Sequence, residues 1–382
     1  MVRLATALAS AALVSATLAG DHPLRAHSAT VTLRRIPEGG LQPQVATSAD
    51  GTIHLVYFLG EPGRGDLFYA RSRDGGATLS RPVRVNTTQG SAIATGTIRG
   101  AQIAVGSRGR VHVAWNASDN NGMLYARTND QGTAFEPQRN LIRRTGGVDG
   151  GGGLAVDPAG NVYVAWHASE KDAAPGEGGR RVWVARSPDE GRTFMPETPA
   201  WDERTGACGC CGMAFSADRR GNVYALYRSA RELVHRDVYL LTSVDGGRIF
   251  RGTLLSPWET SSCPMSSMAF AEGPSGAIAA WETAGDVRFT RVAADGTSAS
   301  STISPPGEGR NRKHPRLAVN NAGQVLFVWT EGTAWARGGS IAWRVFGPDG
   351  RALEESGGRA DLTAWSFGAA AAQADGSFTV FH

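Results

Sequence analysis

The chain has 382 residues, a formal net charge of +4, and 50 glycines and 10 tryptophans beside only 4 cysteines. Hydrophobic residues make up 41% of it, enough for a large core, which excludes an intrinsically disordered chain. The basic residues form no run longer than a pair such as Arg180-Arg181, which excludes a nucleic-acid-binding surface. A chain this rich in glycine and tryptophan and this poor in charge is typical of many short strands joined by tight turns.

Residues 1–19 have the pattern of an export signal. Arg3 is the only early positive charge, residues 4–18 are apolar and rich in alanine, and Thr17-Leu18-Ala19 fits a cleavage site. The stretch is too short for a membrane span, and no second apolar stretch approaches ~18 residues. We therefore expect a bacterial chain without a membrane span, whose mature part (20–382) is secreted or periplasmic, where disulfides are permitted.

A hairpin phrase recurs seven times after this segment, which makes repetition the main sequence signal. Each copy has a short apolar strand, a turn that contains glycine, and a second strand that usually ends in an aromatic residue. The copies span residues 43–58, 101–115, 153–166, 212–227, 267–281, 315–329 and 366–381. Residues 30–36 have strand character without a preceding hairpin, so we expect them to pair with the C-terminal hairpin.

A second phrase, Ser-x-Asp-x-Gly-x-Thr-aromatic, lies between the hairpins and is complete at Ser187 to Phe194. Near copies span 72–79, 128–135 and 243–250, and remnants stand at Asp295-Gly296 and Asp349-Gly350. The aspartate can accept hydrogen bonds from amides of its own turn, and the glycine supplies a positive φ. These repeats resemble the Asp-box, or bacterial neuraminidase repeat, of the sialidase superfamily.

The resemblance implies an all-β fold, a single β-propeller with four-stranded blades around a central axis. The hairpin count predicts seven blades, whereas sialidases have six, which stays as the alternative. The N-terminal strand and the C-terminal hairpin would share one blade and close the ring. In the family, the Asp-boxes are structural turns on the face opposite the active site, so we assign them no chemistry.

Strand alternation predicts which residues share the opposite face, here called the mouth face. They are the residues just before each hairpin and just after its closing aromatic. Sialidases use a tyrosine nucleophile relieved by a glutamate, an acidic aspartate, and three arginines that clamp the substrate carboxylate. The residues that could take these roles are a clamp of Arg99, Arg228 and Arg316, an acid–base pair of Asp149 and Glu282, and Tyr227.

All four cysteines precede two consecutive hairpins: Cys208, Cys210 and Cys211 before the fourth, and Cys263 before the fifth. In an exported chain this predicts disulfides, either Cys208–Cys263 with Cys210–Cys211, or Cys263 with Cys210 or Cys211. We expect at least one bond to join the two blades. The alternatives are a redox-active thiol pair, or a copper or zinc site, with further ligands from Met265, His167 and His314.

Three functions from different classes follow from these patterns. The first is an exo-α-sialidase-type glycoside hydrolase that acts on an acidic glycan at the mouth of the axis. The second is a non-catalytic propeller that binds a glycan or a protein. The third is a periplasmic protein centred on a metal or on the thiols. We expect a monomer with a glycan or another small acidic ligand, and no cofactor unless copper or zinc occupies the cysteines.

Overall fold

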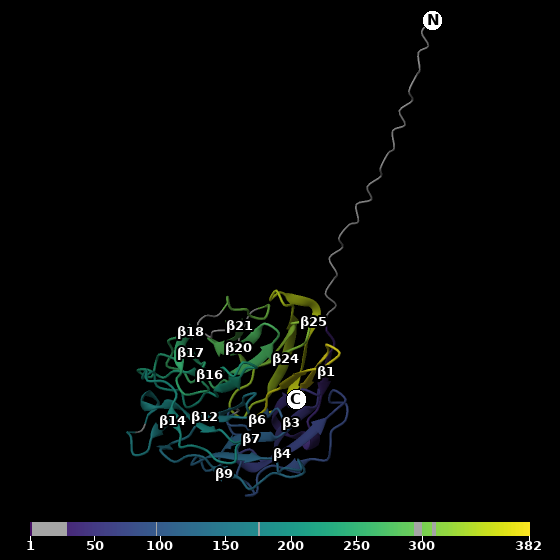
Figure 1. Cartoon of the computed structure of the whole chain (residues 1–382). Helices are drawn as coiled ribbons and strands as arrows, with labels where there is room; N and C mark the ends of the chain where they lie inside the picture. Colours follow the sequence, from purple (N-terminus) through teal and green to yellow (C-terminus); the bar gives the residue numbers. More distant parts are fainter. Residues whose placement is uncertain (2–28, 97, 175, 294–299, 308–310) are drawn as a thin grey trace.

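The seven hairpins form the inner strands of seven separate sheets in the computed structural model (Figure 1). Glycines at their turns adopt the left-handed backbone that a tight turn needs, as at Gly160 and Gly221 (φ 86° and 84°). The structure describes residues 1, 29–96, 98–174, 176–293, 300–307 and 311–382. The predicted signal segment 1–19 and the remnant Asp295-Gly296 therefore lie outside the described residues.

Each blade runs from an innermost strand outward. Blade 1 contains β2 (Leu41–Thr47), β3 (Ile53–Glu61), β4 (Arg64–Ser72) and β5 (Val83–Arg84). Blade 2 contains β6 (Gln102–Val105), β7 (Val111–Asn116), β8 (Met123–Arg127) and β9 (Arg139–Asn140). Blades 3 and 4 contain β11 (Gly153–Val156), β12 (Val162–Glu170), β13 (Arg181–Ser187), β14 (Thr198–Pro199), then β15 (Ala214–Ala217), β16 (Val223–Arg228), β17 (Val238–Ser243) and β18 (Arg251–Ser256).

The second half of the chain continues the pattern with small departures. Blade 5 contains β19 (Ala269–Gly273), β20 (Gly276–Thr283) and β21 (Asp286–Arg291). Blade 6 contains β22 (Arg312–Val319), β23 (Val325–Glu331), β24 (Gly339–Phe346) and β25 (Ala352–Leu362). Blade 7 contains β26 (Ala369–Ala372), β27 (Phe378–Phe381) and β1 (Val31–Arg34). The short strand β10 (Thr145–Gly146) adds to β12, and two 3-10 helices lie in connections, at Pro37–Gly39 and Glu177–Gly179. This architecture confirms the predicted seven blades.

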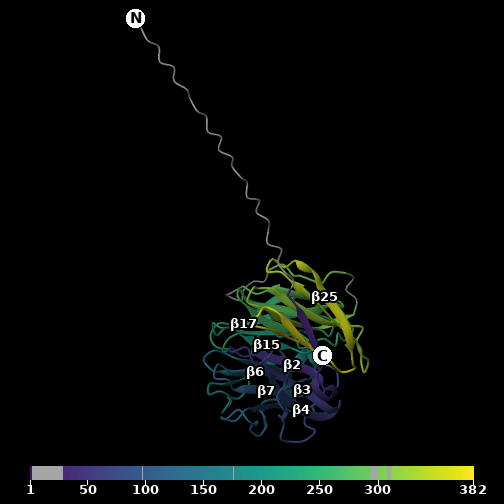
Figure 2. The ribbon, with the colours of Figure 1, turned by 90° about the vertical axis from the view of Figure 1, so that its right-hand side faces the viewer.

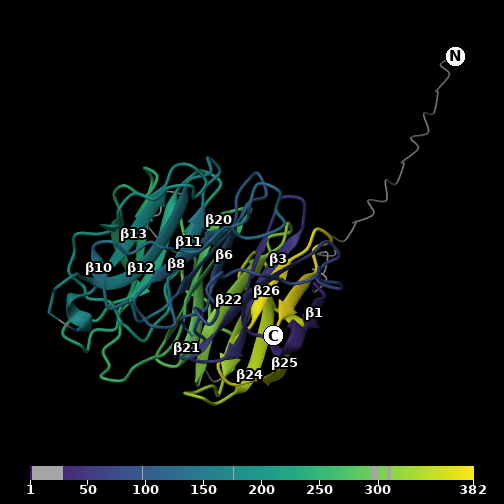
Figure 3. The ribbon, with the colours of Figure 1, turned by 90° about the horizontal axis from the view of Figure 1, so that it is seen from below.

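The two ends of the chain close the ring in blade 7. β1 pairs with β27, so the purple N-terminal strand lies among the yellow C-terminal strands (Figures 2 and 3). The sequence predicted this pairing but not its direction, which is parallel. The direction follows from the next blade: β2 must begin at the mouth face, and a parallel β1 ends there beside the C-terminus. The Ile36 amide donates to the His382 carbonyl (3.1 Å), which anchors this crossing.

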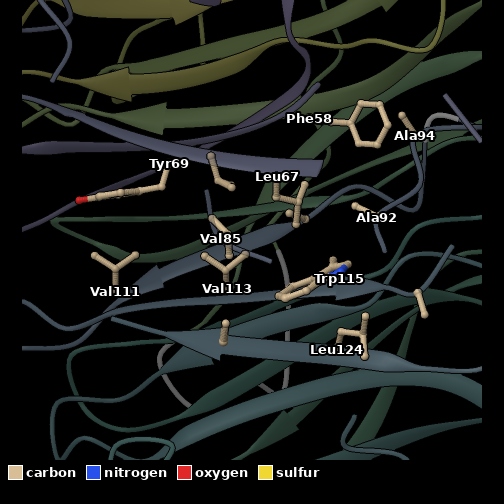
Figure 4. Packing of buried hydrophobic residues seen from close by; sticks show 14 residues of the cluster. Phe58, Leu67, Tyr69, Val85, Ala92, Ala94, Val111, Val113, Trp115 and Leu124 are labelled. Carbon is tan, nitrogen blue, oxygen red and sulfur yellow. The ribbon is translucent and has the colours of Figure 1, made fainter. Parts of the chain in front are cut away.

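The core consists of seven apolar clusters, one between each pair of neighbouring blades of the described chain. Figure 4 shows the one between blades 1 and 2, where Phe58 and Leu67 face Val113 and Trp115. The aromatic residues that close the hairpins fill these interfaces, among them Trp166, which is fully buried. Contacts between successive innermost strands continue around the ring until β26 contacts β2.

Each Asp-box turn within the described residues connects a third strand to a fourth strand, so these turns share one face. In the complete copy, Asp189 accepts hydrogen bonds from the Ser187 hydroxyl (2.7 Å) and from the Thr193 amide (2.9 Å) and hydroxyl (2.7 Å). The hairpin turns reach the same face, which leaves the opposite ends of the strands for the mouth face. No helix among the described residues is long and apolar enough to cross a membrane.

Candidate functional site

Four cysteines from blades 4 and 5 form one sulfur cluster at the mouth face. Cys210 and Cys263 are joined by a disulfide, while Cys208 and Cys211 are free thiols. The sulfur of Cys208 lies 3.3 Å from the sulfur of Cys210 and 3.3 Å from that of Cys211. The expected bond between the two blades is thus present. The two free thiols differ from our expectation that all four sulfurs would be bonded or held by a metal.

The two free thiols differ in proton affinity. Burial raises the pKa of Cys211, but a hydrogen bond donated by the Cys208 thiol and the nearby positive charge of Arg228 outweigh burial and lower that pKa to about 7. The hydrogen bond to Cys211, together with burial, raises the pKa of Cys208. The pair is therefore arranged as a thiol that donates to a thiolate.

A metal fits this cluster only under one condition. The sulfurs of Cys208, Cys210 and Cys211 lie within 4.8 Å of one another, a spacing that suits a soft metal such as copper or zinc. A bonded sulfur is not a thiolate ligand, so the bond from Cys210 to Cys263 would first have to be reduced. Three thiolate donors would therefore be available to a metal only in the reduced protein.

The other predicted metal ligands have other partners. The Nε2 atom of His167 lies 3.1 Å from the Cys211 carbonyl oxygen, so this residue supports the cysteine loop through the backbone. His314 is buried in blade 6, and its Nδ1 atom lies 3.3 Å from the hydroxyl of Ser267, which precedes blade 5. Met265 has a left-handed backbone (φ 48°) two residues after Cys263 and is half-buried.

A charged network lies directly against the cysteine loop. Arg99 forms an ion pair with Asp149, and Arg180 lies 3.6 Å from the other oxygen of that carboxylate. Glu177 accepts a hydrogen bond from the Gly209 amide (2.5 Å). A Cβ atom at Gly209 would clash with the Arg180 guanidinium and lie 2.7 Å from the Asp149 carboxylate. A larger residue there would push these side chains away from the cysteine loop.

Arg228 and Glu282 form a sealed ion pair and are not free at the mouth. Their terminal atoms are 3.1 Å apart, and their side chains are 1% and 2% exposed. Arg228 also donates to the Arg236 carbonyl oxygen (2.8 Å) and stacks over Trp258. Burial raises the pKa of Glu282 against the pull of Arg228. The pair joins blades 4 and 5 beneath the cysteines.

Tyr227 and Arg316 lie apart from Arg99 and Asp149. Tyr227 is buried between blades 3 and 4, its hydroxyl 2.6 Å from the Thr205 hydroxyl, and burial raises its pKa. Arg316 lies over the ring of Phe367 and lines a cavity of about 150 Å³ on the axis. Burial lowers the pKa of Arg316 to about 10. The six predicted catalytic residues therefore do not converge on one point, and only Arg99 and Asp149 meet at the mouth.

Two tryptophans that the sequence analysis did not single out line the mouth face. Trp335 is 58% exposed, and its ring packs edge-on against that of Trp365, with centroids 4.8 Å apart. A Cβ atom at Gly96 would lie 3.3 Å from Arg99 and 3.7 Å from Trp335, so the tryptophan loop of blade 6 reaches the loop that carries Arg99. The signal was available, because Trp335 follows a closing aromatic and Trp365 precedes a hairpin.

A second hollow, of about 620 Å³, opens on the face of the Asp-box turns. Hairpin turns of blades 1 to 5 form its wall, and its charged side chains include Asp50, Arg108, Asp157, Asp218 and Arg219. These aspartates already accept hydrogen bonds within their own turns. The mouth face and this turn face are thus the two places where a ligand could approach the axis.

The fold is a seven-bladed β-propeller with Asp-box turns, so the all-β propeller that the resemblance implied is confirmed, and the six-blade alternative is wrong. No protein-family model matches the chain, and no curated protein matches it in sequence. The Hadza microbial sialidase Hz136 is similar in structure (TM-score 0.52, 14% identity), over 76% of this chain and 63% of that one. This chain therefore spans less than two thirds of that sialidase.

Other solved structures are similar over most of both chains. An α-L-arabinanase from Penicillium chrysogenum, complexed with arabinobiose, has a TM-score of 0.50 and 18% identity, over 86% of this chain and 94% of that one. An α-L-arabinofuranosidase from Fusarium graminearum, complexed with an iminosugar inhibitor, has a TM-score of 0.53 and 13% identity, over 88% and 97%. At these identities the likeness concerns the fold alone.

Proposed function

We propose that the chain binds an acidic carbohydrate at the mouth face. The observation that carries this proposal is the exposed ring of Trp335, held in place by Trp365 beside Arg99. Trp335 and Trp365 form an aromatic pair at the mouth face, and a flat aromatic ring with a polar N–H matches the apolar face and the hydroxyls of a sugar. The export signal and the inter-blade disulfide support action outside the cytoplasm.

Arginine supports an acidic rather than a neutral ligand. Arg337 stands two residues after Trp335 in the same turn, is exposed, and forms no ion pair with the described residues. Arg99 lies near Trp335, across Gly96, but already donates to Asp149 and to the Thr95 carbonyl oxygen, so Arg337 is the cation of this pair that is open to a ligand. A guanidinium can bind a carboxylate through two parallel hydrogen bonds. A sugar that carries a carboxylate, such as a terminal sialic acid, would fit both the ring of Trp335 and the guanidinium of Arg337.

The geometry favours binding over hydrolysis. Tyr227 and Glu282, the candidates for a sialidase nucleophile and its partner, are buried in different blade interfaces. The carboxylates that do face the mouth, Asp149 and Glu177, are each ion-paired with arginine. An ion-paired carboxylate is a poor proton donor, and glycoside cleavage needs a general acid.

Calorimetric titration with 3′-sialyllactose, and with lactose as the neutral sugar, tests the proposal. We expect the wild type to bind sialyllactose and Trp335→Ala to bind it at least tenfold more weakly, about 1.4 kcal/mol. Ile249→Ala is the matched control, because Ile249 is 68% exposed on the turn face. Equal affinity for both sugars, or no effect of Trp335→Ala, would contradict the proposal.

A rate assay separates binding from catalysis. We expect no release of umbelliferone from an umbelliferyl sialoside between acidic and neutral pH. Turnover that disappears in Asp149→Asn would instead make the chain a hydrolase that uses the mouth carboxylates.

A further inference from the structure

The four cysteines of the sulfur cluster differ in solvent exposure. Cys263 is exposed and Cys210 is half-buried, whereas Cys208 and Cys211 are buried. The disulfide thus faces outward, and the two thiols lie behind it. Cys208 is the link, because its sulfur lies 3.3 Å from one sulfur of the disulfide and 3.3 Å from the other thiol.

These positions meet the requirements of thiol–disulfide exchange. The reaction needs a sulfur nucleophile in contact with a disulfide sulfur, and a leaving thiol that can be stabilised. Cys208 supplies the contact, and the exposed Cys263 is a leaving group that water can protonate. Cys211 has the spacing Cys-x-x-Cys to Cys208 and accepts its hydrogen bond.

We propose that the four cysteines form an internal relay that moves a disulfide between the exposed pair Cys210–Cys263 and the buried pair Cys208–Cys211. In the first step, the Cys208 proton passes to Cys211 and the Cys208 sulfur attacks the Cys210 sulfur. The new Cys208–Cys210 bond forms as the Cys210–Cys263 bond breaks, and the Cys263 thiolate takes a proton from water.

In the second step, the Cys211 sulfur attacks Cys208 and forms the buried disulfide, while Cys210 leaves and takes up the proton that Cys211 loses. One disulfide and two thiols stand on each side of the reaction, so no outside oxidant or reductant is needed. The result is a thiol pair, Cys210 and Cys263, presented at the mouth face. That pair can then reduce an accessible disulfide of another molecule, and the two electrons come from this chain, which then holds both the Cys210–Cys263 and the Cys208–Cys211 bond.

Peptide mapping of alkylated, unreduced protein tests the relay. The wild type, labelled in its native state with iodoacetamide, should yield labelled Cys263 together with the Cys208–Cys211 disulfide. Cys208→Ser lacks the attacking sulfur, so labelling of its Cys263 should be at least tenfold slower. Cys211→Ser lacks both the acceptor of the Cys208 proton and the second attacking sulfur, so it should form the Cys208–Cys210 bond with a free Cys263 more slowly than wild type forms its products, and it should never form a buried disulfide.

Three further measurements check the folding of the variants, the number of free thiols and the presence of a metal. Thermal melts of the variants check that they fold, and a thiol titration of denatured wild type should find two thiols. The relay is contradicted if the wild type keeps Cys210–Cys263 as its only bond under native labelling. It is also contradicted if the denatured protein has no thiols, or if elemental analysis finds stoichiometric copper or zinc that blocks labelling of Cys208.

Discussion

Asp189 illustrates what one side chain contributes to an Asp-box turn. It accepts three hydrogen bonds from its own turn, which, outweighing burial, lower its pKa to about 2. Asp130 occupies the same position in the second copy but is bound instead by Arg110 (2.5 Å) and lies on the surface. In the second copy the side chain of Asn129 accepts the turn amide instead, from Thr133 (3.0 Å). The same residue type at the same motif position can therefore have different hydrogen-bond partners and a different effect on stability.

We predict that Asp189→Ala lowers the free energy of unfolding by on the order of 1–2 kcal/mol, because the turn amides lose their acceptor. Asp130→Ala should leave the Tm nearly unchanged, since a surface ion pair contributes little. Thermal melts of the two variants beside wild type measure this difference. Equal Tm shifts in both variants would show that the turn bonds do not matter.

Single residues also show where sequence reasoning stops. Strand alternation correctly placed Arg99, Asp149 and the cysteines on the mouth face, because that depends only on the repeat. It could not reveal that Arg228 and Glu282 neutralise each other, since their contact depends on how two blades rotate against one another. The cysteine pairing was open for the same reason. Pairing between blades is a property of packing, which a periodic pattern does not encode.

At the scale of elements, equivalent strands solve the same problem differently. The second residue of β3 and of β7 is histidine, and each ring lies within 2.8 Å of a tyrosine hydroxyl. In β12 and β16 the same position is a tyrosine that donates to an aspartate (2.9 Å). Burial lowers the pKa of His54 to about 4 and that of His112 to about 3.

These histidines predict how stability depends on pH. Their folded pKa lies below the unfolded value near 6.5, so the unfolded chain binds the proton more readily. The stabilisation is complete above about pH 6.5 and is lost as the pH falls, down to about 4 for His54 and about 3 for His112. For His112 the loss at pH 4.5 is on the order of 2–3 kcal/mol. Carboxylates with lowered pKa values, such as Asp189, act only below about pH 4, so measurements down to pH 4.5 report mainly on the histidines.

Urea unfolding between pH 7 and pH 4.5 measures this effect. His112→Gln should be less stable at pH 7 but should show a clearly smaller loss on acidification than wild type. A variant that loses as much stability as wild type would assign the pH dependence to other groups.

Closure of the ring marks the boundary of what the elements could predict. The seven hairpins and their turns follow from local patterns, since each strand pair is adjacent in sequence. The pairing of β1 with β27 joins residues at opposite ends of the chain. Counting unmatched strands predicted the partner, but the parallel direction depends on where β2 must start. Trp335 was missed because it lies several residues beyond the closing Trp329, whereas strand alternation assigned only the residue just after each closing aromatic to the mouth face.

At the scale of the whole molecule, the two faces of the ring differ in what their side chains do. On the turn face, aspartates and hydroxyl residues form hydrogen bonds within their own turns. The mouth face gathers exposed aromatic rings, arginines and the sulfur cluster, which local structure does not require. The scaffold itself is held by seven similar interfaces between blades, so the mouth loops can vary with little effect on the core. The central claim is therefore that ligands meet this protein at the mouth face.

Hydrogen exchange, measured with and without saturating sialyllactose, tests that claim most directly. If the ligand binds at the mouth face, we expect slower amide exchange in the loops at 98–101 and 332–338, next to Arg99 and Trp335. Exchange in the Asp-box turns at 72–79 and 187–194 should be unchanged. Slower exchange confined to the turns around Asp50, Asp157 and Asp218 would contradict it, because the ligand would then occupy the hollow on the turn face.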